Sequence, residues 1–180
     1  MPVIRLPSEQ DTSYPPARGP VLLLSCMDLR VLDEIVQFMD HDGLVNRYDH
    51  VILAGASLGA LGACRSSHEH WKKTFYDHLE IAHSLHQIKD VYILEHRDCG
   101  AYREFLGSDG DFGDDDAEAE ADCHRKYADL LTKGILEWAE EADVKLKVKA
   151  FLMDLRGRVS RLDQPVASNT RSKKTKKRLQ

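Results

Sequence analysis

A histidine and a cysteine stand three positions apart, directly after a run of apolar residues that is typical of a buried β-strand. Residues 92–100 read YILEHRDCG, with His96 and Cys99 as the two polarizable side chains. An imidazole nitrogen and a thiolate that leave one tight turn can reach the same Zn²⁺ at roughly 2.0 to 2.3 Å, and zinc prefers both ligand types. Because two ligands do not complete a zinc site, another part of the chain has to supply a third.

A second apolar run far upstream ends in a cysteine. Residues 21–25 read VLLLS and are followed directly by Cys26. The ends of the two strands must be neighbours if they share a metal, and the carboxyl ends of parallel strands do lie along one edge of an open α/β sheet. We therefore predict a parallel sheet with helical crossovers, with Cys26, His96 and Cys99 as metal ligands. Three protein ligands leave one position on zinc open, as in catalytic sites.

The remaining periodicity favours the same fold class. Apolar residues recur at helical spacing in three long segments, and short apolar runs of strand type separate them. The predicted helices are 31–40, 68–86, 101–106 and 123–142, and the further predicted strands are 48–54, 90–94, 144–153 and 158–162. Residues 154–157, DLRG, have turn chemistry between the last two strands. The prediction is an α/β fold, a mainly parallel β-sheet flanked by helices, with an antiparallel C-terminal strand.

With 180 residues, the chain is long enough for one domain with a real core. We assign residues 20–165 to a single α/β domain and residues 1–19, with four prolines, to an irregular arm. Eight of the fifteen residues in segment 108–122 are acidic, and we interpret this segment as a solvated, mobile loop. An EF-hand calcium site there would need a ligand order and a closing glutamate that are missing.

Charge is distributed unevenly along the chain. The formal net charge is −5, and residues 171–180 hold six Lys or Arg and no acid, so residues 1–170 carry −5 minus 6, or −11. We interpret residues 166–180 as a basic, disordered, solubilising tail. Contact of this tail with nucleic acid is the alternative that a basic segment leaves open.

The compartment follows from what the sequence lacks. The longest apolar runs are far below the roughly 20 residues that a bilayer helix needs. The amino terminus does not have the charged and apolar regions of a secretion signal. These observations predict a cytoplasmic protein without a membrane span, whose cysteines are thiols or metal ligands. Cys64 and Cys123 are then free thiols.

Two other features have simpler explanations. Residues 54–62, AGASLGALG, match neither the dinucleotide-binding fingerprint nor the P-loop, so we interpret the small residues as allowing close approach of the backbone. The eight histidines other than His96 fit surface or helix-face positions. They are His41, His50, His68, His70, His78, His83, His86 and His124.

An aspartate and an arginine close to Cys26 supply the other groups that a catalytic zinc site needs. Asp28 can lie beside the open position of the metal, and Arg30 can keep that carboxylate ionised and correctly turned. Zinc lowers the pKa of a bound water towards ~7, which gives a hydroxide nucleophile that Asp28 orients. The alternative is that Asp28 is a helix N-terminal carboxylate and Arg30 its partner in a surface ion pair.

The pattern Cys26-x-Asp28-x-Arg30, followed by His96-x-x-Cys99-Gly100, resembles the β-class carbonic anhydrases. The resemblance implies an enzyme with one Zn²⁺ per chain that interconverts CO2 and bicarbonate. It implies a homodimer or higher homo-oligomer with active sites near the subunit interface. It also implies that backbone groups of Ala54, Gly55 and Gly100 line the substrate pocket.

The sequence departs from the family pattern after the second predicted strand. Many members have Arg-Asn-Ala-Gly where this chain has Ile52-Leu53-Ala54-Gly55, so the Ala-Gly pair is kept and the polar pair is absent. Two alternatives therefore stay open, namely hydrolysis of CS2 or COS at the same zinc site and a catalytically silent zinc-binding scaffold. In some relatives the dyad aspartate closes the site as a fourth ligand, which for Asp28 would confine activity to alkaline pH.

Overall fold

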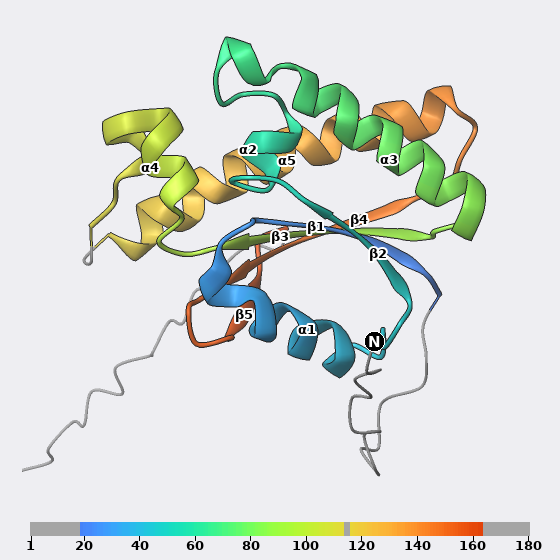
Figure 1. The fold of residues 1–180 in the computed structure, drawn as a ribbon, viewed down its shortest axis with the longest axis horizontal. Coiled ribbons are helices and arrows are strands. Elements are labelled where there is room, and N and C mark those ends of the chain that lie inside the picture. The colour runs from blue at the N-terminus through green and yellow to red at the C-terminus, as the bar shows by residue number, and fades with distance from the viewer. Residues whose placement is uncertain (1–18, 114–115, 164–180) are drawn as a thin grey trace, which may run out of the picture.

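The computed structural model of this chain describes residues 19–113 and 116–163 (Figure 1). The strands are β1 (Val21–Ser25), β2 (Tyr48–Ile52), β3 (Asp90–His96), β4 (Lys147–Met153) and β5 (Val159–Arg161). The helices are α1 (Leu32–His41), α2 (Ser57–Ala60), α3 (His70–His86), α4 (Gly100–Leu106) and α5 (Ala117–Glu141). Short 3₁₀ helices occur at Leu29–Val31, Ser66–His68 and Gly107–Gly110.

The strands form one sheet in the order β2-β1-β3-β4-β5. All neighbouring pairs are parallel except β4 with β5, which is antiparallel. The predicted α/β fold with an antiparallel C-terminal strand is thus confirmed. The turn before β5 forms because the Asp154 side chain accepts the backbone N–H groups of Arg156 and Arg158, both at 2.9 Å.

The strand register decides where the predicted ligands lie. β1 and β3 are adjacent, and Ser25 at the end of β1 pairs with Leu94 of β3. β3 continues to His96, so this residue and Cys26 leave neighbouring strands at the same edge. Both central strands are buried along nearly their whole length, as parallel strands covered on two faces must be.

Helices cover both faces of the sheet (Figure 1). One face packs against α2, α3 and α5 through a core that includes Leu24, Phe75 and Leu131, and the other packs against α1 through Leu23 and Ile35. Not every apolar residue of α1 faces this core: Leu32 and Val36 remain 45% and 48% exposed. The helix was predicted correctly, but part of its apolar stripe points outward.

The largest error in a predicted boundary concerns the start of α5. Segment 108–122 was interpreted as a loop, whereas α5 begins at Ala117 and residues 107–110 form a 3₁₀ turn. The Asp116 side chain caps the helix by accepting the Ala119 N–H at 3.1 Å. Alanine and glutamate are strong helix formers, and acids in a first turn interact favourably with the helix dipole. The cap, the alanines and the two first-turn glutamates, Glu118 and Glu120, therefore favour a helix start at this position.

The predicted arm and basic tail lie almost entirely outside the described residues, so both stay predictions. None of the helices within residues 19–113 and 116–163 has the length and apolar character that a membrane crossing requires.

Candidate metal centre

Three side chains predicted as metal ligands converge at the edge of the sheet. Cys26 directly follows β1, His96 is the last residue of β3, and Cys99 precedes α4. The ligand atoms of Cys26, His96 and Cys99 all lie within 4.8 Å of one another, and the two Sγ atoms are 3.8 Å apart. All three residues are buried, so they form a compact cluster shielded from bulk water.

The His96 ring is oriented for ligation. Its Nδ1–H donates to the backbone carbonyl of Arg97 at 2.9 Å, which leaves the lone pair on Nε2. That Nε2 atom is buried and has no hydrogen-bond partner among the described residues. Because buried polar atoms are almost always partnered, the cluster fits a cation at this nitrogen. A second hydrogen bond that fixes the tautomer is usual for metal-binding histidines.

The two sulfur atoms are coupled electrostatically. The hydrogen bond between the Cys99 and Cys26 thiols lowers the pKa of Cys26 and raises that of Cys99. The backbone N–H of Gly55 also donates to the Cys26 sulfur, at 3.3 Å. Metal binding removes the remaining proton because thiolates are the ligating form. Two thiolates and one imidazole are a donor set that suits zinc.

Asp28 and Arg30 lie beside this cluster as an ion pair. Arg30 donates from Nε to Asp28 Oδ1 at 2.9 Å and from Nη2 to Oδ2 at 2.7 Å, and its backbone N–H adds a third bond at 3.0 Å. The hydrogen bonds from Arg30 lower the pKa of Asp28 to about 2. Asp28 is therefore a carboxylate at neutral pH, and its Oδ2 lies 3.9 Å from His96 Nε2.

A second residue, Asp98, also accepts hydrogen bonds from Arg30. Arg30 Nη1 donates to Asp98 Oδ2 at 2.6 Å, and Nη2 donates to the Asp98 carbonyl at 2.8 Å. Arg103 also pairs with the Asp98 carboxylate. Asp98 adopts φ +54°, a conformation that aspartate tolerates better than most residues. Asp98 was not predicted from the sequence as a partner of Arg30. Its position between the proposed ligands His96 and Cys99 indicated that it lies near the site.

A cavity of about 420 Å³ opens on the outer side of the cluster. It is lined by Cys26, Met27, Asp28, Leu29, Ala54, Gly100, Ala101, Glu104 and Phe105. Two of the predicted pocket residues, Ala54 and Gly100, thus line it, whereas Gly55 contacts the Cys26 sulfur instead. The lining is mainly apolar, with Asp28 near the metal cluster and Glu104 as its other carboxylate.

A buried polar network lies behind the ligands and was not predicted. Glu95, next to His96, accepts the Ser57 N–H on Oε1 at 3.0 Å, and its Oε2 faces the Tyr102 hydroxyl at 3.3 Å and His124 Nδ1 at 3.0 Å. Of the two positions predicted for His124, the helix face is right and the surface is wrong, because this residue lies on α5 and is fully buried against Glu95. The signal was a glutamate within an otherwise apolar strand, which requires buried donors.

The other two cysteines lie outside the candidate metal cluster. Cys64 and Cys123 are free thiols, as predicted. Burial raises the pKa of Cys64 to about 11 and also raises that of Cys123. Thiols of this kind behave as small apolar groups.

The sequence matches a protein family described as "Putative carbonic anhydrase" over residues 19–111. Two relatives are uncharacterized proteins of Rickettsia bellii and Rickettsia conorii, which are 36% and 35% identical over 141 and 142 residues. These alignments cover 78% of this chain and 80% and 70% of the two relatives.

Two solved structures share the fold. One belongs to the tetrameric β-carbonic anhydrases of Sordaria macrospora, with a TM-score of 0.52, 17% identity and 82% of both chains covered. The other is Coccomyxa β-carbonic anhydrase in complex with acetazolamide, with a TM-score of 0.54 and 16% identity over 83% of this chain and 74% of that chain. At these identities the likeness is one of fold.

Proposed function

We propose that this chain, which belongs to the β-class carbonic anhydrase family, is a zinc enzyme that hydrates CO2 reversibly to bicarbonate. The observation that carries the proposal is the convergence of three ligand atoms, one each from Cys26, His96 and Cys99, within 4.8 Å of one another. The Asp28–Arg30 ion pair beside them supplies a carboxylate next to the position where a nucleophile would stand.

Each residue then has a distinct part in the reaction. Zinc, when held by the two cysteines and the histidine, lowers the pKa of a water towards ~7 and so supplies a nucleophile near neutral pH. With zinc bound, the Asp28 carboxylate would accept a hydrogen bond from that nucleophile and so orient it towards CO2. Arg30 holds both oxygens of Asp28 in place. The cavity next to Ala54 and Gly100 admits the small apolar substrate.

We expect zinc-loaded protein to hydrate CO2 already at about pH 7 and faster at about pH 8.5, because the nucleophile titrates near neutrality. Arg30 lowers the pKa of Asp28 to about 2, so Asp28 is ionised throughout this range. Its titration therefore does not contribute to the pH dependence of the hydration rate. Stopped-flow hydration on metal-quantified protein measures both rates. Activity confined to alkaline pH would instead favour Asp28 as a fourth ligand that closes the site.

Hydrolysis of CS2 or COS is the second candidate, and the apolar cavity lining favours it. Met27, Leu29 and Phe105 surround the approach to the cluster, and no polar pair precedes Ala54. Release of sulfide from CS2 or COS, at rates well above that of CO2 hydration, would favour this reaction. Stoichiometric zinc without turnover of CO2, CS2 or COS would identify a catalytically silent scaffold.

We further propose a homo-oligomer that covers the apolar surface next to the cluster. Met27 and Leu29 are 64% and 81% exposed, which is unusual for large apolar residues beside a functional site. Light scattering should give a dimer or larger mass for the native chain and a lower mass for the Met27→Glu, Leu29→Glu variant. Leu85→Glu, on the outer side of α3, is the control and should leave the mass unchanged. A monomeric native chain would contradict the proposal.

A further inference from the structure

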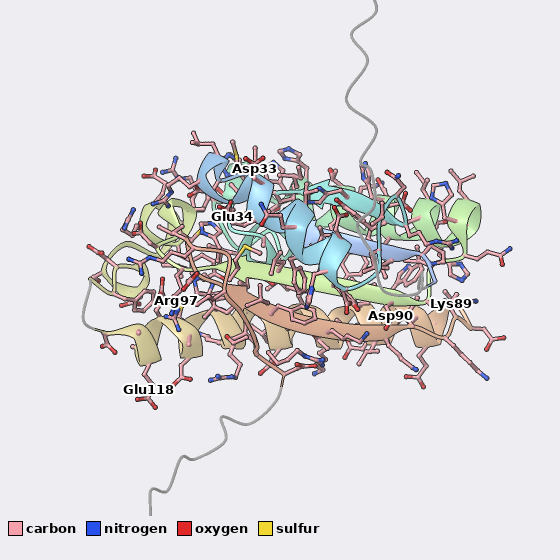
Figure 2. All side chains as sticks on the ribbon, turned by 90° about the horizontal axis from the view of Figure 1, so that it is seen from below. Asp33, Glu34, Lys89, Asp90, Arg97 and Glu118 are labelled. Atoms are coloured by element: carbon pink, nitrogen blue, oxygen red, sulfur yellow. The ribbon has the colours of Figure 1, made fainter. Side chains whose placement is uncertain are left out.

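The described lining of the cavity beside the metal cluster contains two carboxylates and no basic side chain. Asp28 and Glu104 supply the carboxylates, and none of the described residues that line the cavity is Lys, Arg or His. The cavity lies where β3 ends, and Figure 2 shows Arg97, which follows this end, far from Lys89 and Asp90 at the start of the strand. The charge on the cavity wall is therefore negative.

Each carboxylate pairs with an arginine that lies outside the lining. Arg30 binds both oxygens of Asp28, at 2.9 and 2.7 Å, and Arg65 forms an ion pair with Glu104. The carboxylate of each pair is thus next to the cavity, and the guanidinium is not. Because Coulomb energy falls with distance, the nearer carboxylate has the larger effect on a charged ligand in the cavity.

Arg65 also holds the part of the cavity wall from which Glu104 extends. Its guanidinium carbon lies 5.5 Å from the centroid of the Phe105 ring, and Phe105 lines the cavity as well. The rings of His68 and Trp71 contact the same phenyl ring, with centroid distances of 5.8 and 6.4 Å. These contacts hold the wall in place, so the Glu104 carboxylate has a defined position although its side chain is 61% exposed.

A carboxylate on the wall discriminates between ligands by their charge. It raises the free energy of an anion in the cavity and leaves that of an uncharged molecule nearly unchanged. Asp28 already has a part in the proposed reaction, whereas Glu104 has none. CO2, CS2 and COS carry no net charge, so a negative wall does not oppose their entry and does oppose anions that compete for the metal.

We infer that Glu104 is a specificity-determining residue, which makes the cavity favour uncharged molecules over anions at the metal. Arg65 is its positioning partner and offsets part of its charge. The inference rests on the proposed function in one respect, since it takes a metal to be bound at the cluster, but it does not depend on turnover.

The test measures ligand binding on the full chain with Co²⁺ in place of Zn²⁺, because Co²⁺ accepts the same ligands and absorbs visible light. Thiocyanate is the anionic probe and imidazole the uncharged one, at about pH 8.5 and about 0.01 M ionic strength, where the Debye length is roughly 30 Å. We expect Glu104→Gln to bind thiocyanate about threefold more tightly, or more, and to bind imidazole as the native chain does. Arg65→Gln, which leaves Glu104 unpaired, should bind thiocyanate about threefold more weakly. Both differences should disappear when sodium sulfate, a poor metal ligand, raises the ionic strength to about 1 M.

Glu137→Gln is the matched control, because it removes the same charge at a distant place. Glu137 is 60% exposed and pairs with Lys133 at 3.7 Å, so it resembles Glu104 in exposure and in having a cationic partner. It lies on α5, about 30 Å along the helix from Ala117, and it does not line the cavity. Both probes should bind this variant as they bind the native chain.

Several results would overturn the inference. An equal change in the affinities for thiocyanate and imidazole would show that Glu104→Gln alters the shape of the cavity rather than its charge. A change of the same sign in Glu104→Gln and Arg65→Gln would show that the pair has a structural part only. Unchanged thiocyanate affinity in Glu104→Gln, with cobalt bound and CO2 hydrated by the zinc-loaded native chain, would refute the inference and leave the proposed function standing. A chain that binds neither metal would overturn both.

Discussion

Replacing Cys99 by alanine should remove both the bound zinc and all measurable turnover. The side chain supplies one of three ligand atoms, and its sulfur lies 3.8 Å from that of Cys26. Two ligands cannot hold zinc as a tetrahedral three-ligand site does, so we expect metal content to fall from about one per chain to near zero. Metal analysis and stopped-flow CO2 hydration on the same preparation measure the two losses together.

Cys123→Ala is the matched control for this variant. It removes the same atoms from a free, partly buried thiol outside the cluster, and it should keep zinc and turnover. Full zinc content in Cys99→Ala would show that the metal is bound elsewhere. Because a lost structural contact alone could lower activity, circular dichroism of both variants has to show the native fold.

The convergence of the three proposed ligands could be predicted because it follows from local patterns. Cys26 and His96 stand at the ends of apolar strands, and the rule that parallel strands share a carboxyl edge brings these ends together. Residues 19–111, which include all three proposed ligands, are also the part that matches the family. The strand pattern of the sequence and its resemblance to the family therefore predicted the same fold and the same position for the candidate metal site.

The supporting residues could not be predicted because they depend on how distant elements pack. His124 reaches Glu95 only because α5 crosses the sheet next to β3, and a helical pattern alone does not say which histidine faces inward. Asp98 contacts Arg30 with its carboxylate and its carbonyl, and it does so in a left-handed backbone conformation that the sequence pattern does not predict. The start of α5 was also predicted wrongly from composition, because a run of acids and alanines is compatible both with a loop and with a capped helix.

The same packing explains why the Asp28–Arg30 pair is rigid. Arg30 binds Asp28 with two side-chain bonds and Asp98 with two more, so its guanidinium is fixed between two carboxylates. Asp98 in turn is held by Arg103 and donates its N–H to Glu120 Oε1 at 2.5 Å. This chain of contacts positions Asp28 without using any metal ligand.

Replacing Asp28 by asparagine should leave zinc bound and reduce CO2 hydration by roughly 10²- to 10³-fold, mainly in kcat. Asparagine lacks the charge that Arg30 binds, and its amide group would present donors where the carboxylate presents acceptors only. The nucleophile then loses the acceptor that orients it. The loss corresponds to about 3 to 4 kcal/mol of activation free energy.

The two mechanisms for Asp28 predict opposite results for this variant at neutral pH. If Asp28 orients the nucleophile, Asp28→Asn is slower than the native enzyme at both about pH 7 and about pH 8.5. If Asp28 instead closes the site as a fourth ligand, removing its charge opens the site, and activity near pH 7 rises relative to the native enzyme. Arg30→Lys provides the internal control, because lysine cannot bind Asp28 and Asp98 with the same planar group. Its rate should fall between those of the native enzyme and Asp28→Asn, since the carboxylate remains but is less well fixed.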